Sequence, residues 1–245
     1  GEGTQRVEEA LLRIFPSARV LRLDSDAAGD SQNLAQALSA VRQGEVDILV
    51  GTQMLSKGHD FAGITLVCVL AMDQGLYSID FRGPERMFQQ LAQVAGRAGR
   101  GQRLGEVLVQ TEHPENPAYA RLVQHDFAGF ANTALAERKA AAYPPFARFV
   151  LLRAESAHSR PPLDFLRSAV RVGKARAARA GVRLMEPVPS PMERRAGRYR
   201  AQLLLAASNE GQLHRFLDDW LVRLEGLREA TRVRWSVDVD PQEMY

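Results

Sequence analysis

Cysteine is almost absent from this sequence, and long apolar runs are absent altogether. Cys68 is the single cysteine among 245 residues, so the chain has no internal disulfide and no zinc site built on several cysteines. It lies in an apolar run at residues 66–70, where we expect a buried side chain. No run of about 18 apolar residues occurs, which argues against a membrane span.

Signals for targeting are also missing. The chain begins at Gly1 without an initiating methionine, a basic leader or an apolar leader, so we expect a fragment without a targeting signal. The lack of disulfides is typical of a reducing compartment, and a cytoplasmic location is expected.

The formal net charge of +3 is unevenly distributed. Residues 1–140 sum to −3 and residues 141–245 to +6. An excess of cations in the second part favours an anionic partner there.

Hydrophobic periodicity predicts alternating helices and strands in the first part of the chain. Helices are expected at residues 4–15, 34–41, 84–95 and 118–140, and strands at 19–24, 47–51, 64–71 and 106–110. The continuous apolar runs of two strands are typical of a parallel sheet that is covered on both faces. The first part is therefore predicted to be α/β.

The segment from Tyr143 to Phe146 interrupts this pattern with two prolines, so we predict domains at residues 1–141 and 142–245. Strands are expected at residues 149–154, 182–187, 199–206 and 233–239, and helices at 163–180 and 211–230. The resulting βαββαβ order is similar to a ferredoxin-like unit and indicates a small α+β domain. This scaffold is common and predicts little about function.

A loop with several functional groups follows the strand at 47–51. It carries hydroxyl groups at Thr52 and Ser56, a cation at Lys57 and a carboxylate at Asp60. Ligands of parallel α/β sheets bind at the edge where such strands end. Hydroxyls and backbone amides can hold a phosphodiester chain, and a lone carboxylate can accept a hydrogen bond from a ribose.

A pair of arginines follows the helix at 84–95. Arg97 and Arg100 are three positions apart, so at a helix end they share a face. Two guanidinium groups directed at one point suit a triphosphate undergoing transfer. Gly96 and Gly99 weaken a helix, which favours phosphate binding over a solvated helix end that interacts with the macrodipole.

Together the two segments resemble motifs V and VI of superfamily 2 helicases. The motifs are Thr-x-x-x-x-x-Gly-x-Asp from Thr52 and Gln-x-x-Gly-Arg-x-Gly-Arg from Gln93. Residues 50–59, 191–200 and 235–241 are similar to the primosomal protein N′ (PriA) family in particular. The resemblance spans nearly the whole chain and implies a partial RecA-like second helicase lobe followed by a C-terminal domain.

This resemblance implies an ATP-dependent 3′→5′ DNA helicase that recognises stalled or recombination-derived forks and restarts replication by primosome assembly. Gln93, Arg97 and Arg100 would face the triphosphate as catalytic residues. The ATP site would include Asp60, Gly58 and Gly96, and the DNA strand would contact Thr52, Gln53, Lys57 and the backbone around Gly58. The alternative is a module that binds DNA and single-stranded-DNA-binding protein (SSB) without ATPase activity of its own.

The family's phosphate loop, magnesium box and zinc module are not among these residues. ATP and Mg²⁺ are therefore expected in the full-length parent, zinc only in the upstream module, and the isolated chain is expected to be inactive. The expected partners are single-stranded and forked DNA, the C-terminal tail of SSB and other primosome proteins, with no membrane.

A second candidate site lies in the basic part of the chain. Its residues are Arg194, Arg195, Arg198, Arg200 and Gln202. We expect a mobile basic loop that enters a strand, with Arg198, Arg200 and Gln202 on one face. Three interpretations remain open: single-stranded DNA with Tyr199 or Tyr143 as a stacking surface, an acidic, Phe-ending SSB tail, or a solvated hairpin.

Two further features have ambiguous interpretations. The helix at 163–180 carries five cations that are either solvated or directed at DNA: Arg167, Arg171, Lys174, Arg176 and Arg179. Asp73 and Asp80 are expected to be solvated loop carboxylates, or to cap the helix that begins near Pro84.

Overall fold

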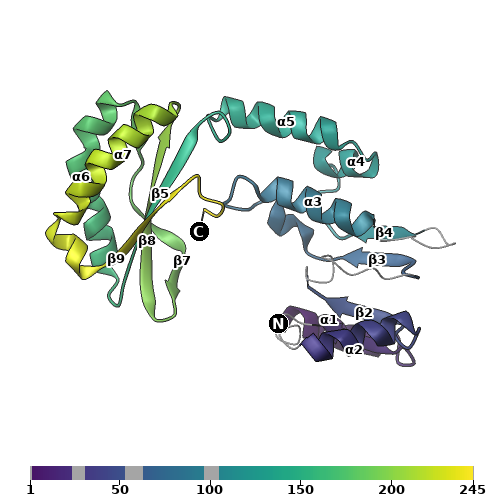
Figure 1. Cartoon of the computed structure of the whole chain (residues 1–245). Helices are drawn as coiled ribbons and strands as arrows, with labels where there is room; N and C mark the ends of the chain where they lie inside the picture. The colour runs from purple at the N-terminus through teal and green to yellow at the C-terminus, as the bar shows by residue number, and fades with distance from the viewer. Residues whose placement is uncertain (1, 24–30, 53–62, 97–104, 245) are drawn as a thin grey trace. The chain divides into compact units, whose positions relative to one another are not determined.

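The computed structural model describes residues 2–23, 31–52, 63–96 and 105–244. The chain forms two compact units, residues 1–127 and 128–245 (Figure 1). The domain boundary expected at residues 141/142 stays a prediction.

The N-terminal unit begins with two helix–strand pairs. Helix α1 (Glu2–Ile14) precedes β1 (Val20–Leu23), and α2 (Ser31–Arg42) precedes β2 (Ile48–Gly51). The two strands are parallel, with Val20 opposite Ile48. At the start of this pair, Arg19 donates to Asp47 from its backbone N–H at 2.8 Å and from its guanidinium at 2.7 and 2.9 Å. These hydrogen bonds hold the pKa of Asp47 well below its ordinary value.

A second parallel pair consists of β3 (Leu66–Val69) and β4 (Glu106–Val109). The chain between them contains the short 3₁₀ helix η3 (Met72–Gly75) and helix α3 (Gly83–Ala95), and α4 (Pro117–Val123) follows β4. Helix α3 buries Met87 and Leu91, which pack with Tyr119, Val69 and Val109. The alternation of helices and parallel strands agrees with the predicted α/β class.

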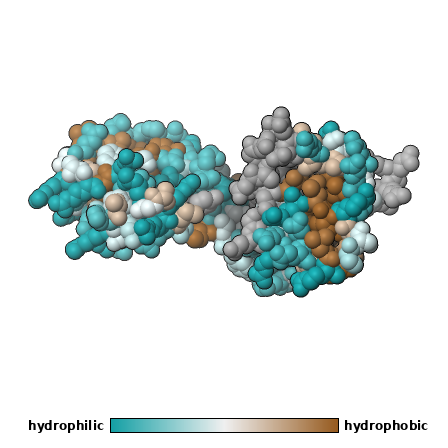
Figure 2. Space-filling model, turned by 90° about the horizontal axis from the view of Figure 1, so that it is seen from below, coloured by the Kyte–Doolittle hydropathy of each residue, from teal (hydrophilic) through white to brown (hydrophobic). Residues whose placement is uncertain are grey.

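Two expectations are wrong for β3: a buried Cys68 and a strand that is covered on both faces. Cys68 is exposed, and Leu66 and Leu108 are each 50% exposed. Alternate residues of β3 therefore pack on α3 while the others face outward. Figure 2 shows an apolar patch on the surface of the N-terminal unit.

The C-terminal unit has an antiparallel sheet covered on one face by two helices (Figure 1). Its elements are α5 (Phe127–Ala140), β5 (Arg148–Ser156), α6 (Arg160–Arg179), β6 (Val182–Leu184), β7 (Val188–Arg195), β8 (Arg198–Ala207), α7 (Glu210–Glu225), η4 (Arg228–Arg232) and β9 (Arg234–Val239). The strand order is β6-β8-β5-β9, with β7 also paired to β8. The core lies between the sheet and helices α6 and α7, with Leu152, Leu203 and Trp220 fully buried.

Two elements differ from the sequence-based expectation. Strand β7 was expected to be a loop, because Pro189 and Pro191 lower the strand propensity of the segment. It pairs with β8 alone, and its register shifts between Pro189 and Arg194. The single helix expected over residues 118–140 is wrong, because α4 ends at Val123 and His125 has a φ of 55°, which a continuing helix does not allow.

No helix within the described ranges is long and apolar enough to cross a membrane.

Candidate functional site

The structure describes three residues of the predicted nucleotide and DNA site. Thr52 is exposed directly after the carboxyl end of β2. Gln93 is exposed in the last turn of α3, and the backbone N–H of Gly96 ends this helix by donating to Ala92 at 3.0 Å. The remaining candidates, Gln53, Lys57, Gly58, Asp60, Arg97 and Arg100, lie outside the described residues.

The start of α3 is held by Asp80, whose side chain is only 1% exposed. Its Oδ1 accepts the backbone N–H of Arg82 at 3.0 Å, and its backbone carbonyl accepts the N–H of Gly83 at 2.7 Å. Arg86 lies 3.2 Å from Oδ2 in an ion pair that lacks hydrogen-bond geometry. Of the two roles expected for Asp80, solvation is wrong, whereas a role at the start of the helix near Pro84 agrees with these contacts.

Two glycines let the chain before α3 pack closely against it. A Cβ on Gly83 would lie 2.5 Å from the carbonyl oxygen of Gly75. A Cβ on Gly75 would lie 2.8 Å from the Cβ of Met87. Both distances are shorter than carbon contacts allow, so any larger residue would force the segments apart. The close packing ties η3 to α3.

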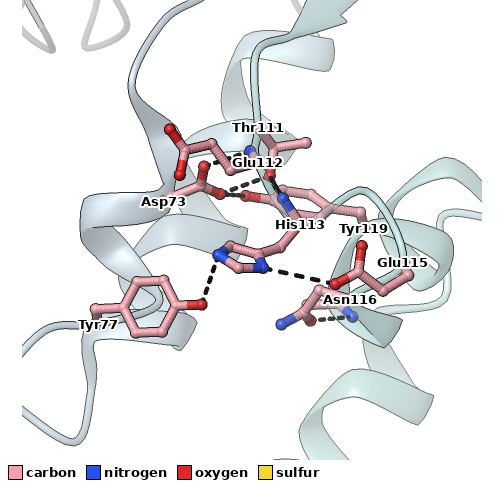
Figure 3. A network of polar contacts seen from close by, with 9 residues as sticks. Asp73, Tyr77, Thr111, Glu112, His113, Glu115, Asn116 and Tyr119 are labelled. Carbon is pink, nitrogen blue, oxygen red and sulfur yellow. Dashed lines mark hydrogen bonds and ion pairs between the residues drawn. The ribbon is translucent and has the colours of Figure 1, made fainter.

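Asp73 is the centre of a polar network after β3 and β4 (Figure 3). Its carboxylate accepts hydrogen bonds from the Thr111 hydroxyl at 2.6 Å, from the backbone N–H of Glu112 at 2.7 Å and from the Tyr119 hydroxyl at 3.0 Å. These bonds, first that of Thr111 and then that of Glu112, lower the pKa of Asp73 because they favour the charged form. Burial is the main reason that the pKa of Tyr119 is raised.

The network continues to a histidine on the same side (Figure 3). The hydroxyl of Tyr77 and Nε2 of His113 are 2.7 Å apart, and Nδ1 of His113 is 3.5 Å from Glu115. Since β3 and β4 are parallel, their carboxyl ends meet at one edge, which is where ligands of α/β sheets bind. The network joins the segment that follows β3 to the segment that follows β4 at this edge.

The second candidate site lies on the hairpin formed by β7 and β8. Arg194 and Arg195 belong to β7, and Ala196 and Gly197 form the turn with φ values of 49° and 78°. The predicted loop is therefore a paired hairpin. Gly197 suits this turn because its φ is rarely adopted by other residues.

The structure separates the candidate residues of this site into two groups. The guanidinium of Arg194 lies 5.2 Å from the centroid of the Tyr199 ring, and these two residues pair across the hairpin. By the alternation of a strand, Arg198, Arg200 and Gln202 point to the opposite face from Tyr199. Tyr199 is thus not beside these three side chains as a stacking surface.

A groove of about 400 Å³ forms on the face of Arg198 and Arg200. It is lined by Glu155, Arg195, Ala196, Arg198, Arg200 and Arg234. The sequence did not predict Glu155 or Arg234 as site residues. The strand expected before Glu155 ends at Ala154, and Arg234 lies inside the last expected strand, at residues 233–239. The alternation of Arg234 with the apolar residues of β9 is the signal that could have found it.

Gln202 lies on the same face, where its side chain is hydrogen-bonded to the main chain near the C-terminal end of the sequence. Its Nε2 donates to the carbonyl oxygen of Met244 at 3.2 Å, and Arg153 donates to that of Glu243 at 2.7 Å. Met244 is 9% exposed. This face therefore already accommodates one segment of peptide main chain.

Acidic partners accompany three of the five cations that the sequence places between residues 163 and 180, within α6. Arg167 pairs with Asp164 at 3.6 Å, and Arg171 lies 4.0 Å from Glu229. Arg176 pairs with Asp219 of α7. This pairing weakens the case for α6 as a continuous anion-binding face.

Comparisons with known proteins cover both units. Residues 2–102 match the helicase conserved C-terminal domain, and residues 139–242 match the primosomal protein N C-terminal domain. The replication restart protein PriA of Haemophilus influenzae is 36% identical over 244 residues, which are 100% of this chain and 33% of that protein. PriA of Bacillus subtilis is 36% identical over 100% of this chain and 30% of its own length. PriA of Synechocystis sp. is 41% identical over 98% of this chain and 28% of its own length.

The chain thus spans about a third of the length of the curated relatives that it matches. Among solved structures, the de novo designed protein Foldit4 aligns at a TM-score of 0.29 and 10% identity, over 40% of this chain and 99% of its own. That likeness is too low to support any argument about fold or function.

Proposed function

Because this chain belongs to the replication restart protein PriA family as a C-terminal part, we propose that its parent is an ATP-dependent 3′→5′ DNA helicase. The parent would recognise stalled or recombination-derived forks and restart replication by primosome assembly. The observation that carries this proposal is the match of PriA relatives along the whole chain, with separate family models on residues 2–102 and 139–242.

In this proposal the N-terminal unit is part of the second RecA-like motor lobe. Gln93, Arg97 and Arg100 would stabilise charge on the transferring phosphoryl group, while Asp60, Gly58 and Gly96 would lie at the nucleotide. Thr52, Gln53 and Lys57 would contact the DNA strand. The exposure of Thr52 after a strand and of Gln93 at a helix end supports these roles, because both side chains are accessible to a ligand.

ATP and Mg²⁺ would be bound by the full-length parent, which would also carry zinc in a module upstream. The groups that hold the β- and γ-phosphates are expected in the other lobe, and arginines alone supply charge without assembling a site. The isolated chain would therefore be inactive.

The C-terminal unit would be a βαββαβ domain with β7 added, starting near residue 142. It would bind single-stranded or forked DNA, or the C-terminal tail of SSB, through Arg195, Arg198 and Arg200, with Arg194 and Gln202 at the margins. The groove of four arginines supports an anionic ligand there. Other primosome proteins are further proposed partners, and the parent would act in the cytoplasm.

The second candidate function is a module that binds DNA and SSB without ATPase activity, which the same groove would also support. Unwinding of a labelled fork by the full-length parent distinguishes the two. Strand separation with ATP, and none with a non-hydrolysable analogue, is the result expected for a helicase. Fork binding without strand separation under both conditions would favour the binding module.

A further inference from the structure

The polar network around Asp73 also reaches helix α3 through Tyr119. The hydroxyl of Tyr119 donates to Oδ1 of Asp73 at 3.0 Å, and the buried Tyr119 ring packs against Met87 and Leu91 (Figure 3). Met87 and Leu91 are four residues apart in α3, so they lie on one face of that helix. The carboxylate of Asp73 is thus linked through a single side chain to the helix that carries Gln93.

The orientation of Tyr119 depends on this carboxylate. Hydrogen bonds to a carboxylate are short and strong, and the carboxylate of Asp73 accepts two more of them. Its Oδ1 also accepts the Thr111 hydroxyl at 2.6 Å, and its Oδ2 accepts the backbone N–H of Glu112 at 2.7 Å. Three donors from the segment after β4 therefore hold the carboxylate in place, and the carboxylate in turn holds the Tyr119 ring against α3.

A second connection to α3 runs through η3, the element that contains Asp73. Met72 and Leu76 pack against the same apolar cluster of α3 as Tyr119 does. The space between Gly75 and Met87 is too small for an added Cβ, which would lie 2.8 Å from the Cβ of Met87. Helix α3 is therefore held to the network from the side of η3 and from the side of α4.

These contacts bear on catalysis because they lead to Gln93. Leu91, which the Tyr119 ring contacts, is two residues before Gln93, and α3 ends at Ala95. In the proposed function Gln93 faces the triphosphate. Catalytic groups must be held to within about 0.5 Å, and a displacement of about 1 Å can cost about 100-fold in rate. A small movement of α3 would thus lower the rate while the lobe stays folded.

We infer that Asp73 is a positioning residue for ATP hydrolysis by the parent and that it acts through Tyr119 and α3 on Gln93. The inference rests on the proposed function and adds a structural requirement to it. Asp73 takes no direct part in the chemistry. Its carboxylate fixes Tyr119, and the ring of Tyr119 sets the position of the last turns of α3.

The test measures the DNA-stimulated ATPase activity of the full-length parent with three conservative variants, Asp73→Asn, Thr111→Val and Tyr119→Phe. Each variant removes one part of the network and nearly keeps the shape of its side chain. We expect kcat to fall about tenfold in each variant, because the position of a catalytic group is altered. The KM for ATP and the affinity for single-stranded DNA are expected to change less than about twofold.

Two control variants separate positioning from stability. Thr111→Ser keeps the hydroxyl donor, so its kcat is expected to stay within about twofold of the original. Leu23→Ala removes a buried apolar side chain of β1 outside the network, so it lowers stability without moving Gln93. Thermal unfolding gives the folded fraction of each variant, and kcat is expressed per folded molecule. If Asp73→Asn does not fold, the other two network variants decide.

Several outcomes would overturn the inference. One is a kcat within about twofold of the original in both Thr111→Val and Tyr119→Phe. Others are an equal loss in Thr111→Ser or Leu23→Ala, or a raised KM with an unchanged kcat. An unmodified parent without ATPase activity would contradict the proposed function itself, whereas an active parent with unaffected variants contradicts this inference alone.

Discussion

Asp80 and the backbone of Arg82 are joined by a hydrogen bond of 3.0 Å that the fold hides from solvent. This bond and the ion pair with Arg86 hold the first turn of α3, the helix that carries Gln93 and ends at Gly96. A carboxylate at the start of a helix also interacts favourably with the macrodipole. Asp80 thus links the segment after β3 to the helix that precedes the arginine pair.

We predict that Asp80→Ala lowers the free energy of unfolding of the N-terminal unit by about 2–4 kcal/mol, because it removes a buried acceptor and leaves Arg82 and Arg86 without it. Asp80→Asn keeps an oxygen that can accept the backbone N–H, so about half of that loss is expected. Urea unfolding followed by circular dichroism measures both. The control is Glu106→Gln, an exposed carboxylate on β4. Equal midpoints for Asp80→Ala and the control would contradict this account.

The network around Asp73 predicts a dependence of stability on pH. Hydrogen bonds from Thr111 and Glu112 lower the pKa of Asp73 in the folded state. A depressed carboxyl pKa contributes stability that is present above the unfolded pKa, near 4, and that is lost as pH falls through the folded pKa.

Thr111→Val removes the hydroxyl donor, so we expect the pKa of Asp73 to rise toward its ordinary value. The N-terminal unit should then lose less stability between pH 5 and pH 2 than the original chain does. Carboxyl-detected NMR titration gives the pKa directly, and urea unfolding at several pH values gives the stability. An unchanged Asp73 pKa in Thr111→Val would show that the hydroxyl bond does not determine it.

The arginine pair gives a kinetic prediction for the full-length parent. Arg97→Ala or Arg100→Ala should lower kcat of the DNA-stimulated ATPase by about 10³-fold or more, because such arginines stabilise charge in the transition state. Affinity for DNA should change by less than about twofold, because the proposed DNA contacts are made by Thr52, Gln53 and Lys57. Lost DNA binding with preserved ATPase would show that the segment from Gln93 to Arg100 has been misinterpreted.

The sequence predicted correctly those helices and strands whose apolar residues follow a clear period and whose ends are marked by proline or glycine. Helix α3 was predicted at residues 84–95 because Pro84 marks its start and Gly96 its end. Strand β4 agrees equally well with its apolar run. The sequence also drew attention to the segment from Gly96 to Arg100 and to the hairpin arginines, because both are unusual local clusters of arginine and glycine.

Features that depend on contacts distant in the sequence were not predictable in this way. Arg200, Glu155 and Arg234 lie side by side only because β8, β5 and β9 are neighbours in the sheet. Burial of Asp80 likewise depends on how its loop folds against α3. Strand β7 was missed because pairing with β8 outweighs the low strand propensity of a segment that contains two prolines.

ATPase activity of the isolated chain tests the central claim most directly. If these residues are part of one lobe of a two-lobed motor, the chain has no DNA-stimulated ATPase activity on its own, whereas the full-length parent hydrolyses ATP and loses this activity with Arg97→Ala. The measurement is phosphate release by both proteins with and without single-stranded DNA. Turnover by the isolated chain that Arg97→Ala abolishes, or a parent that binds DNA without any hydrolysis, would contradict the account.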